Sequence, residues 1–235
     1  GDMSQNQMMR RFMIRAAARP LLAKEIKYPI KIEKESEDEN ARVKYKIKNF
    51  KKPLSWQKAY KICKNIMHKK IKSNKPLLKL SCFPNSTLKV KEIENILKEW
   101  EKEEWTADVI VIDYADILNM DYYGLEGRER INETWKQLRA LSQKYHCLVV
   151  TATQSDADSY DVKTMGKSNF SEDKRKIAHV TGMIGLNQTN EEKINGVIRL
   201  NWIARREEEF HEFVCVYVAG CLSIGNPAVK SCYED

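Results

Sequence analysis

Long apolar runs are missing from this sequence. No stretch approaches the roughly 18 consecutive apolar residues that a membrane-crossing helix needs, so we expect neither a membrane span nor a membrane partner. The first residues also lack the basic, apolar and small-residue order of a secretory signal peptide. Both absences predict a cytoplasmic protein.

Paired cysteine motifs are missing as well. The six cysteines contain no CxxC pair, and several stand inside apolar runs. Buried free thiols in a reducing compartment are the favoured interpretation, and a zinc site or a disulfide framework is the weaker alternative. The cysteines are Cys63, Cys82, Cys147, Cys215, Cys221 and Cys232.

A glycine-rich phosphate-binding loop is the third absence. Such a loop has the form GxxxxGKS or GxxxxGKT, and none of the nine glycines has that spacing. Gly166 followed by Lys167 comes nearest, but Asp161 stands where the pattern needs glycine, and no predicted strand leads into it. The chain therefore contains no recognisable cradle for nucleotide phosphates.

Positive charge is present in excess. Lysine and arginine total 41 against 33 acidic residues, a formal net charge of +8 in a chain of 235 residues. Much of the excess lies in residues 42–52 and 61–79. This balance suits a polyanionic partner such as a nucleic acid, and a solvated lysine face is the alternative for each stretch.

Apolar spacing predicts an alternation of helices and strands. Ser4 can cap the first helix and Pro20 ends it, and residues 27–53 are predicted to form a hairpin or a mobile arm. Helices are predicted over residues 4–20, 55–72, 90–100 and 126–146, strands over residues 77–83, 108–114 and 147–154, and a long loop over residues 155–176. This order predicts one α/β domain over residues 1–235, with a largely parallel sheet between helices and antiparallel strands near the C-terminus.

Two of these strands end in polar residues. The stretch ADVIVIDYADILN carries an apolar strand into Asp113, with a second carboxylate at Asp116, and the next strand ends at Gln154. Ligands of parallel sheets bind beyond the carboxyl ends of the strands. A carboxylate there can order Mg²⁺ through its water shell, and a neighbouring amide can sense a phosphate. The alternative is that Asp113 only leads its strand into solvent.

Several blocks of the sequence resemble the ATPase domain of DnaB-type hexameric replicative helicases, within the RecA-like superfamily. They are GDMSQNQMMRRF, LLKLSCFPNSTLKVKEIENI with DVIVIDYADIL, INETWKQLRALSQKYHCLVVTATQ, and the tail from SNFSEDKRK to GVIRLNWIARR. The resemblance leaves out roughly residues 24–54. It implies a P-loop ATPase core whose phosphate loop precedes Gly1, so that this fragment alone is expected to be inactive.

The resemblance also implies roles for single residues. Asp113 matches the Walker B carboxylate that holds Mg²⁺ through water, and Gln154 matches the γ-phosphate sensor. Asp2 stands where the family usually has its catalytic glutamate, one methylene shorter. Arg206 is the preferred arginine finger and Arg205 the alternative; both can instead pair with the acidic residues 207–209. Asp116 takes a second-rank role because the family usually has an uncharged residue there.

The implied function is that of an ATP-dependent helicase motor in a bacterial or phage-infected cell. The resemblance implies ATP and Mg²⁺ as cofactors, single-stranded DNA as a partner and a hexameric ring as the assembly. The candidate DNA-binding residues are Lys163, Lys167, Lys174 and Arg175 in the loop of residues 155–176. One alternative is a RecA-like ATPase of recombination, regulation or packaging that does not unwind DNA. The other is a degenerate, non-catalytic interaction module.

Overall fold

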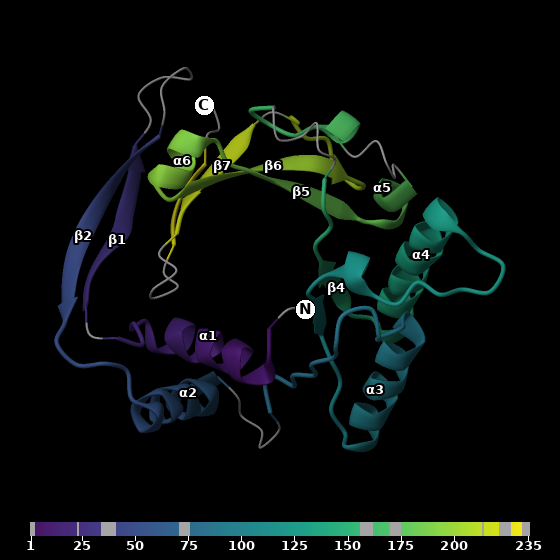
Figure 1. Cartoon of the computed structure of the whole chain (residues 1–235), viewed down its shortest axis with the longest axis horizontal. Coiled ribbons are helices and arrows are strands. Elements are labelled where there is room, and N and C mark those ends of the chain that lie inside the picture. The colour runs from purple at the N-terminus through teal and green to yellow at the C-terminus, as the bar shows by residue number, and fades with distance from the viewer. Residues whose placement is uncertain are drawn as a thin grey trace. The chain divides into compact units, whose positions relative to one another are not determined.

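The computed structural model describes most of the chain, and Figure 1 labels its elements. The described residues are 3–22, 24–33, 41–70, 76–155, 162–169, 175–212, 214–220 and 227–231. The chain falls into two compact units. The first unit comprises Gly1–Ser4, Leu80–Asp161 and Lys167–Met183, and the second comprises Gln5–Lys79, Val162–Gly166 and Ile184–Asp235.

The first unit is built on two parallel strands. Strand β3 (Val109–Ile112) pairs with β4 (Leu148–Thr151) in a register that sets Ile112 opposite Thr151. The connection between them contains the 3-10 turn η1 (Ala115–Ile117) and helix α4 (Gly127–Tyr145). Helix α3 (Val90–Lys102) precedes β3, and helix α5 (Arg175–His179) follows β4. A helical crossover of this kind is what two parallel neighbouring strands require.

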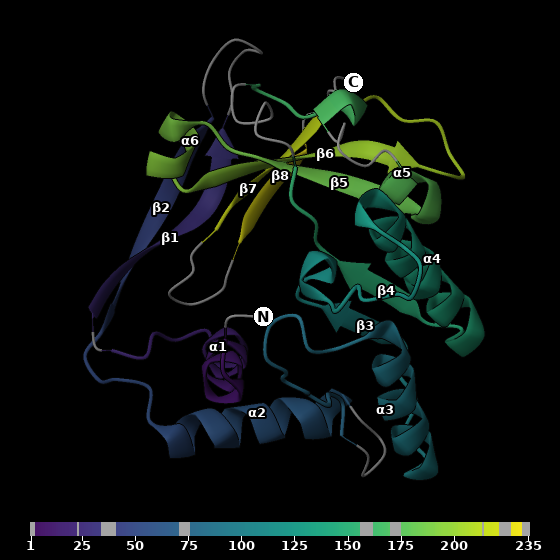
Figure 2. The ribbon, with the colours of Figure 1, turned by 45° about the vertical axis from the view of Figure 1, so that its right-hand side comes forward.

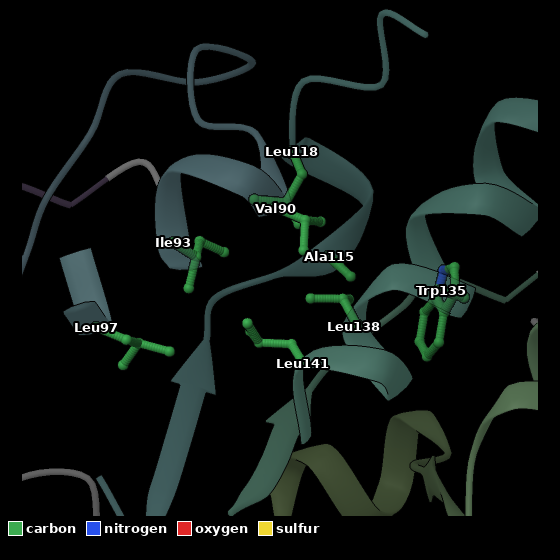
Figure 3. Packing of buried hydrophobic residues seen from close by; sticks show 8 residues of the cluster. All are labelled: Val90, Ile93, Leu97, Ala115, Leu118, Trp135, Leu138 and Leu141. Atoms are coloured by element: carbon green, nitrogen blue, oxygen red, sulfur yellow. The ribbon is translucent and has the colours of Figure 1, made fainter. Parts of the chain in front are cut away.

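Helices α3 and α4 cover one face of this strand pair (Figures 2 and 3). Val90, Ile93 and Leu97 recur at helical spacing along α3, so all three face the same core. The buried side chains of this core are Val90, Ile93, Leu97, Ala115, Leu118, Trp135, Leu138 and Leu141. Ile110 and Ile112 of β3 pack against them. The predicted helices over residues 90–100 and 126–146 are thereby confirmed.

One carboxylate connects the two helices. Glu94 of α3 accepts hydrogen bonds from Lys144 of α4 at 2.6 Å and from Lys91 at 3.0 Å, and it forms an ion pair with Lys98 at 3.0 Å. The side chain of Glu94 is 14% exposed. These ammonium groups, Lys144 first, lower the pKa of Glu94 from 4.5 to about 2.

The predicted strand over residues 77–83 is not observed. The backbone of these residues joins no ladder in the structure, and Leu77 and Leu78 are 59% and 50% exposed. An extended segment becomes a strand only when a neighbouring strand accepts and donates its backbone hydrogen bonds. Strands β3 and β4 form a parallel pair, and the rest of the predicted parallel sheet stays a prediction.

The second unit contains the remaining elements. Helices α1 (Gln5–Ala17) and α2 (Trp56–Lys70) pack together through Met13 and Ala59. Strands β5 (Gly182–Asn187), β6 (Val197–Arg205), β7 (Cys215–Ala219) and β8 (Ala228–Ser231) form one sheet in chain order, with helix α6 (Asn190–Ile194) between β5 and β6 (Figure 2). Its pairs β6–β7 and β7–β8 are antiparallel, which confirms the predicted antiparallel C-terminal strands.

A long two-stranded ribbon completes this unit. Strands β1 (Lys24–Glu33) and β2 (Arg42–Phe50) pair antiparallel, with a register shift between Pro29 and Lys31 (Figure 1). Ile32 near one end joins a buried cluster with residues of β6 and β7, so the ribbon packs against the C-terminal sheet. The two strands span residues 24–50, so they overlap the stretch 27–53, for which a hairpin or a mobile arm is predicted, and begin three residues before it.

The structure bears on the predicted free thiols and on the search for a membrane-spanning helix. Cys63, Cys82, Cys147 and Cys215 are free thiols, and burial raises the pKa of Cys63 and Cys147. Positions 221 and 232 lie outside the described residues. Over the part of the chain that the structure describes, no helix combines the length and the apolar character needed to cross a bilayer.

Candidate functional site

Asp113 and Gln154 leave the same edge of the parallel pair. Asp113 directly follows β3, and Gln154 is the third residue after β4. Thr151 Oγ1 donates to the carbonyl of Ile112 at 3.0 Å, and the Ala115 amide donates to the carbonyl of Ala152 at 3.4 Å, so the two strand exits stay joined beyond the ladder. Both Asp113 and Gln154 are exposed.

The charge chemistry at this edge fits a hydrated cation. A single exposed carboxylate can hold Mg²⁺ through water, which this ion gives up reluctantly. Within the described ranges, no group of three or more histidine, cysteine, aspartate or glutamate side chains could enclose a metal ion directly. Asp113 is therefore the residue that could order Mg²⁺ here, with phosphate oxygens and water as the other ligands.

Asp116 connects the two strand exits. Its Oδ2 accepts a hydrogen bond from Thr153 Oγ1 at 2.7 Å and another from the backbone amide of Gln154 at 3.1 Å. Its Oδ1 accepts from Lys176 Nζ at 3.1 Å, and that ammonium also donates to Thr153 Oγ1 at 2.8 Å. We call Asp116, Thr153, Gln154 and Lys176 the Asp116 cluster.

The Asp116 cluster is sheltered from solvent. The side chains of Lys176 and Asp116 are 13% and 22% exposed. Lys176 Nζ also lies 5.9 Å from the ring centroid of Trp135, within the range of a cation–π contact. Charged groups at reduced exposure are screened less than surface pairs, so salt weakens this ion pair less than an ordinary surface ion pair.

The cluster also brackets the long loop in sequence. Gln154 stands just before residues 155–175, and Lys176 in α5 stands just after them. Asp116 binds both ends. A change in the backbone position of Gln154 therefore moves the carboxylate of Asp116. That carboxylate is also bound by Lys176, at the other end of the same loop.

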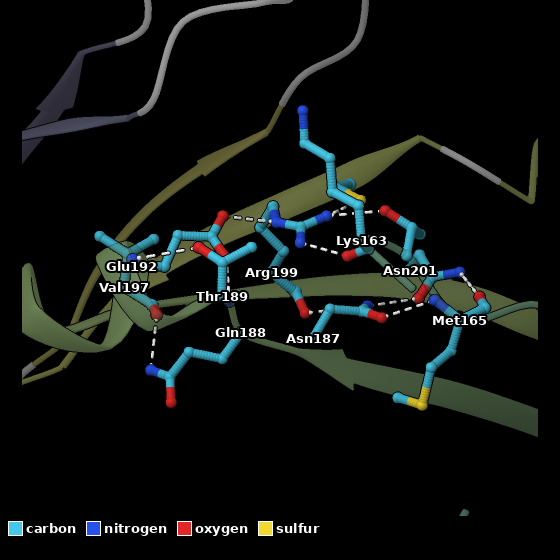
Figure 4. Close-up of polar contacts among 11 residues, drawn as sticks. Lys163, Met165, Asn187, Gln188, Thr189, Glu192, Val197, Arg199 and Asn201 are labelled. Carbon is cyan, nitrogen blue, oxygen red and sulfur yellow. Dashed lines mark hydrogen bonds and ion pairs between the residues drawn. The ribbon is translucent and has the colours of Figure 1, made fainter. Parts of the chain in front are cut away.

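A second group of polar contacts holds the middle of that loop, within the second unit (Figure 4). Arg199 of β6 forms a buried ion pair with Glu192 at 2.5 Å, and their side chains are 2% and 7% exposed. Arg199 also donates to Thr164 Oγ1 at 2.7 Å and to the carbonyl of Lys163. Burial is the largest single effect and lowers the pKa of Arg199, but the hydrogen bond that Arg199 donates to Glu192, the charge of that carboxylate and smaller contributions from Cys215 together outweigh burial, so the pKa of Arg199 is raised.

Two buried asparagines complete this anchorage. Asn187 Oδ1 accepts from the amide of Met165 at 2.7 Å, and Asn201 Nδ2 donates to the carbonyl of Met165 at 2.8 Å. Asn187 Nδ2 donates to Asn201 Oδ1 at 2.8 Å, which fixes both amide groups. The backbone of residues 163–165 is thus bound by strand side chains, while the side chain of Lys163 is exposed.

The other candidate residues are dispersed. Arg205 ends β6, forms an ion pair with Glu208, and lies over the ring of Trp202 at 5.4 Å from its centroid. Arg206 follows it and is exposed. Lys167 is exposed in the loop, and Arg175 is the exposed first residue of α5. The candidates at positions 2 and 174 lie outside the described residues.

Sequence reasoning missed the Asp116 cluster and the Arg199 anchorage. Asp116 and Lys176 are 60 residues apart in the chain, and no local pattern relates them. Arg199 stands in an apolar strand, where a charged residue on the buried face signals a paired charge. That signal was present in GVIRLNWIARR, but its partner Glu192 could not be read from it.

Comparisons with known proteins bear on the fold. Models of protein families and curated proteins give no match to the sequence. Among solved structures, one ATPase domain matches with a TM-score of 0.66 and 13% identity, over 96% of this chain and 71% of that chain. A DnaB-like replicative helicase, described with its interactions with primase, matches with a TM-score of 0.63 and 13% identity. The fold is that of a DnaB-like helicase ATPase domain.

The match to the DnaB-like helicase covers only part of the helicase chain. It covers 96% of this chain but 49% of the helicase chain, so this chain spans about half of that protein. The predicted α/β fold is confirmed at this level, and the largely parallel RecA-like core sheet stays a prediction. At 13% identity the likeness concerns the fold, and the chemistry must be argued from the residues.

Proposed function

We propose that the chain is part of an ATP-hydrolysing motor of the DnaB-like replicative type, which moves along single-stranded DNA in the cytoplasm of a bacterial or phage-infected cell. The observation that carries the proposal is the placement of Asp113 and Gln154 at the same edge of the parallel pair, in a chain with a DnaB-like ATPase fold. That edge is where open α/β sheets bind their ligands.

The residues at this edge have distinct tasks in the proposal. Asp113 orients Mg²⁺ through water, and the ion neutralises phosphate charge when bound. Gln154 contacts the γ-phosphate or the attacking water through its amide. Asp116 is a positioning residue, because it holds the backbone of Gln154 and, through Lys176, the far end of the loop. Lys163, Lys167, Lys174 and Arg175 of that loop are proposed to contact DNA phosphates.

An arginine finger from a neighbouring subunit completes the proposed site. Arg206, or else Arg205, would stabilise charge on the transferring phosphoryl group of the adjacent subunit. This role requires a ring or a filament of subunits, and we propose a hexameric ring. Asp2 is proposed as the base that takes a proton from the attacking water.

A non-catalytic interaction module is the second candidate. A full-length polypeptide without a GxxxxGKS or GxxxxGKT loop would favour it, because such a protein would have no recognisable phosphate cradle. A RecA-like ATPase that hydrolyses ATP without unwinding DNA is the third candidate. Hydrolysis and strand displacement, measured separately on the full-length polypeptide, distinguish the three.

Substitution of Asp113 by asparagine tests the proposal. Asp113→Asn in the full-length polypeptide is expected to lower DNA-stimulated ATP hydrolysis roughly a hundredfold or more, because the Mg²⁺-ordering charge is removed. Asp108→Asn makes the same chemical change at the other end of β3 and is expected to leave the rate unchanged. Circular dichroism and thermal melting check that both variants stay folded. Near-wild-type turnover in Asp113→Asn would remove Asp113 from the site.

A further inference from the structure

Cations of the β1–β2 ribbon are gathered on one face. Directly opposed residues of an antiparallel pair share a face, and alternate residues of a strand do so as well. The register opposes Lys31 to Lys44, Tyr28 to Lys46, and Ile26 to Lys48. The basic face defined in this way carries Lys24, Lys31, Arg42, Lys44, Lys46 and Lys48, and all six residues are exposed.

The same face carries one acidic residue, Glu33, among its described positions. Lys44 and Lys31 bind its carboxylate at 2.7 Å and 3.0 Å. The hydrogen bonds from Lys44 and then Lys31 lower the pKa of Glu33 from 4.5 to about 2, so it stays ionised near neutral pH. It offsets one positive charge of six, and the face remains strongly positive.

The opposite face of the ribbon is used for packing. Ile32 and Val43 join the buried cluster that contains Val197 and Tyr217, and Tyr45 donates its hydroxyl to the carbonyl of Asn195 at 2.6 Å. The packed face thus meets the sheet through apolar and hydroxyl groups. At the other end of the ribbon, Ile26 and Phe50 of the basic face are buried together with Tyr28 against them, while the six cations of that face stay exposed.

Crowding of like charges on one face costs stability. Lys31 and Lys44 stand directly opposite one another, and like charges in that position destabilise a strand pair. Alternate residues on one strand lie about 6.6 Å apart, closer than the Debye length of about 8 Å at physiological salt, so Arg42, Lys44, Lys46 and Lys48 repel one another. A partner with regularly spaced negative charge removes this repulsion.

We propose that the basic face binds the phosphodiester backbone of a nucleic acid. Single-stranded and duplex DNA share this chemistry, because their phosphates form a regular row of charge that lysine binds without reading sequence. The choice of nucleic acid among polyanions rests on the proposed function. The proposal goes beyond it, since the sequence blocks that resemble DnaB-type helicases leave out roughly residues 24–54, and no residue of the ribbon is among the candidate DNA-binding residues given above.

Substitution of two ribbon lysines tests the proposal without nucleotide. Lys46→Gln with Lys48→Gln is compared with wild type in the binding of a fluorescent oligothymidylate and of a short duplex, by anisotropy over a range of salt. Each phosphate that a lysine no longer neutralises lowers the salt slope by about 0.7 on a single strand and about 0.9 on a duplex, so the double substitution lowers it by about 1.4 or 1.8. The form of DNA whose salt slope falls by its full expected amount is the preferred partner.

Two matched controls keep the test sharp. Lys58→Gln with Lys61→Gln removes the same charge from exposed positions of α2 and is expected to leave the slope unchanged. Lys46→Arg with Lys48→Arg keeps the charge and is expected to restore the wild-type slope. An unchanged slope in the ribbon variant, or an equally lowered slope in the α2 variant, overturns the proposal.

A competition arm separates nucleic acid from an acidic protein. Polyglutamate at equal charge concentration is expected to displace the oligonucleotide far less well than unlabelled oligothymidylate; equal displacement overturns the nucleic-acid assignment. The assay needs no ATP hydrolysis. A protein that does not hydrolyse ATP can therefore still show that the basic face binds nucleic acid. Conversely, a protein that hydrolyses ATP can show that the basic face does not bind it.

Discussion

Among single residues, Asp116 has the densest set of connections at the candidate site. Its two oxygens reach Thr153, the backbone of Gln154 and Lys176. An aspartate that binds both ends of a loop can transmit a change at one end to the other only if its charge is intact. The Asp116–Lys176 pair is therefore where substitution is most informative.

Asp116→Asn is expected to uncouple hydrolysis from DNA. The amide keeps the shape of the side chain but lacks the charge that holds Lys176, so the DNA-stimulated part of the ATPase rate should fall roughly tenfold while the DNA-free rate stays near wild type. Steady-state hydrolysis with and without single-stranded DNA measures both rates.

Lys176→Met provides the matching test. It breaks the same pair from the other side, so it should reproduce the defect, and the double variant should be no worse than either single one. Asp121→Asn, at a nearby exposed aspartate, is the control. An equal fall of both rates in Asp116→Asn would show a general loss of structure and would contradict a positioning role.

The sequence pattern located the strand ends but not their connection. Four apolar residues before Asp113 mark a strand, and the following helix and strand predict that Gln154 leaves the same edge. The hydrogen bonds of Asp116 depend on backbone positions beyond the ladder, which no spacing encodes. Lys176 directly follows the candidate residues Lys174 and Arg175 in the sequence. The sequence alone does not show which of these three adjacent cations pairs with a carboxylate.

Helices α3 and α4 illustrate which elements a sequence predicts well. Their apolar residues recur with helical spacing, and the core that they bury follows from that spacing. Residues 77–83 show the converse, because strand formation depends on a distant partner rather than on local composition. The contact between α3 and α4 through Glu94 and Lys144 lies beyond local pattern for the same reason.

The stability of the α3–α4 pair is expected to depend on pH through Glu94. Its folded pKa of about 2 is below the ordinary 4.5, so its contribution is present above about pH 4.5 and is lost as the pH falls toward 2. Glu94→Gln should lower the free energy of unfolding by roughly 1 kcal/mol at pH 7, and this deficit should shrink as the pH falls through 2.

Urea unfolding at pH 7 and at pH 2 to 3 measures this difference. Glu99→Gln, also on α3 and paired with Lys102 at 2.6 Å, is the control, since that glutamate is 66% exposed and screened by solvent. A Glu94→Gln variant with the same deficit at both pH values would show that the carboxylate charge is not what connects the helices.

For the molecule as a whole, the sequence predicts one domain, while the described residues form two compact units. Periodicity assigns elements but does not report which of them share a core. The candidate residues divide between the units, with Asp113 and Gln154 in the first and the two candidate finger arginines in the second. If the finger acts on a neighbouring subunit, variants of the two groups of residues can complement one another in a mixed assembly.

Mixing of two inactive variants should restore activity. In a ring, Arg206→Ala supplies an intact Asp113 and Asp113→Asn supplies an intact Arg206, so an interface between the two is complete. An equal mixture should regain about a quarter of the wild-type ATPase rate, because about that fraction of neighbours is correctly ordered. Hydrolysis measured after exchange of subunits in full-length protein tests this.

The same mixing experiment identifies the finger. Arg205→Ala is mixed with Asp113→Asn in parallel, and only the variant that lacks the true finger should be inactive alone and recover in the mixture. No recovery with either arginine variant would contradict a finger that acts between subunits.

The anchorage of residues 163–165 also determines which substitutions the loop tolerates. Arg199, Asn187 and Asn201 bind the carbonyl of Lys163 and both backbone groups of Met165, so the side chains at these two positions take no part. Thr164 contributes its own hydroxyl, so that position accepts serine more readily than alanine. The side chain at position 163 can therefore change in charge and size while the backbone stays bound. A library of substitutions at this position would test which side chains favour ligand binding without disturbing the anchorage of the loop.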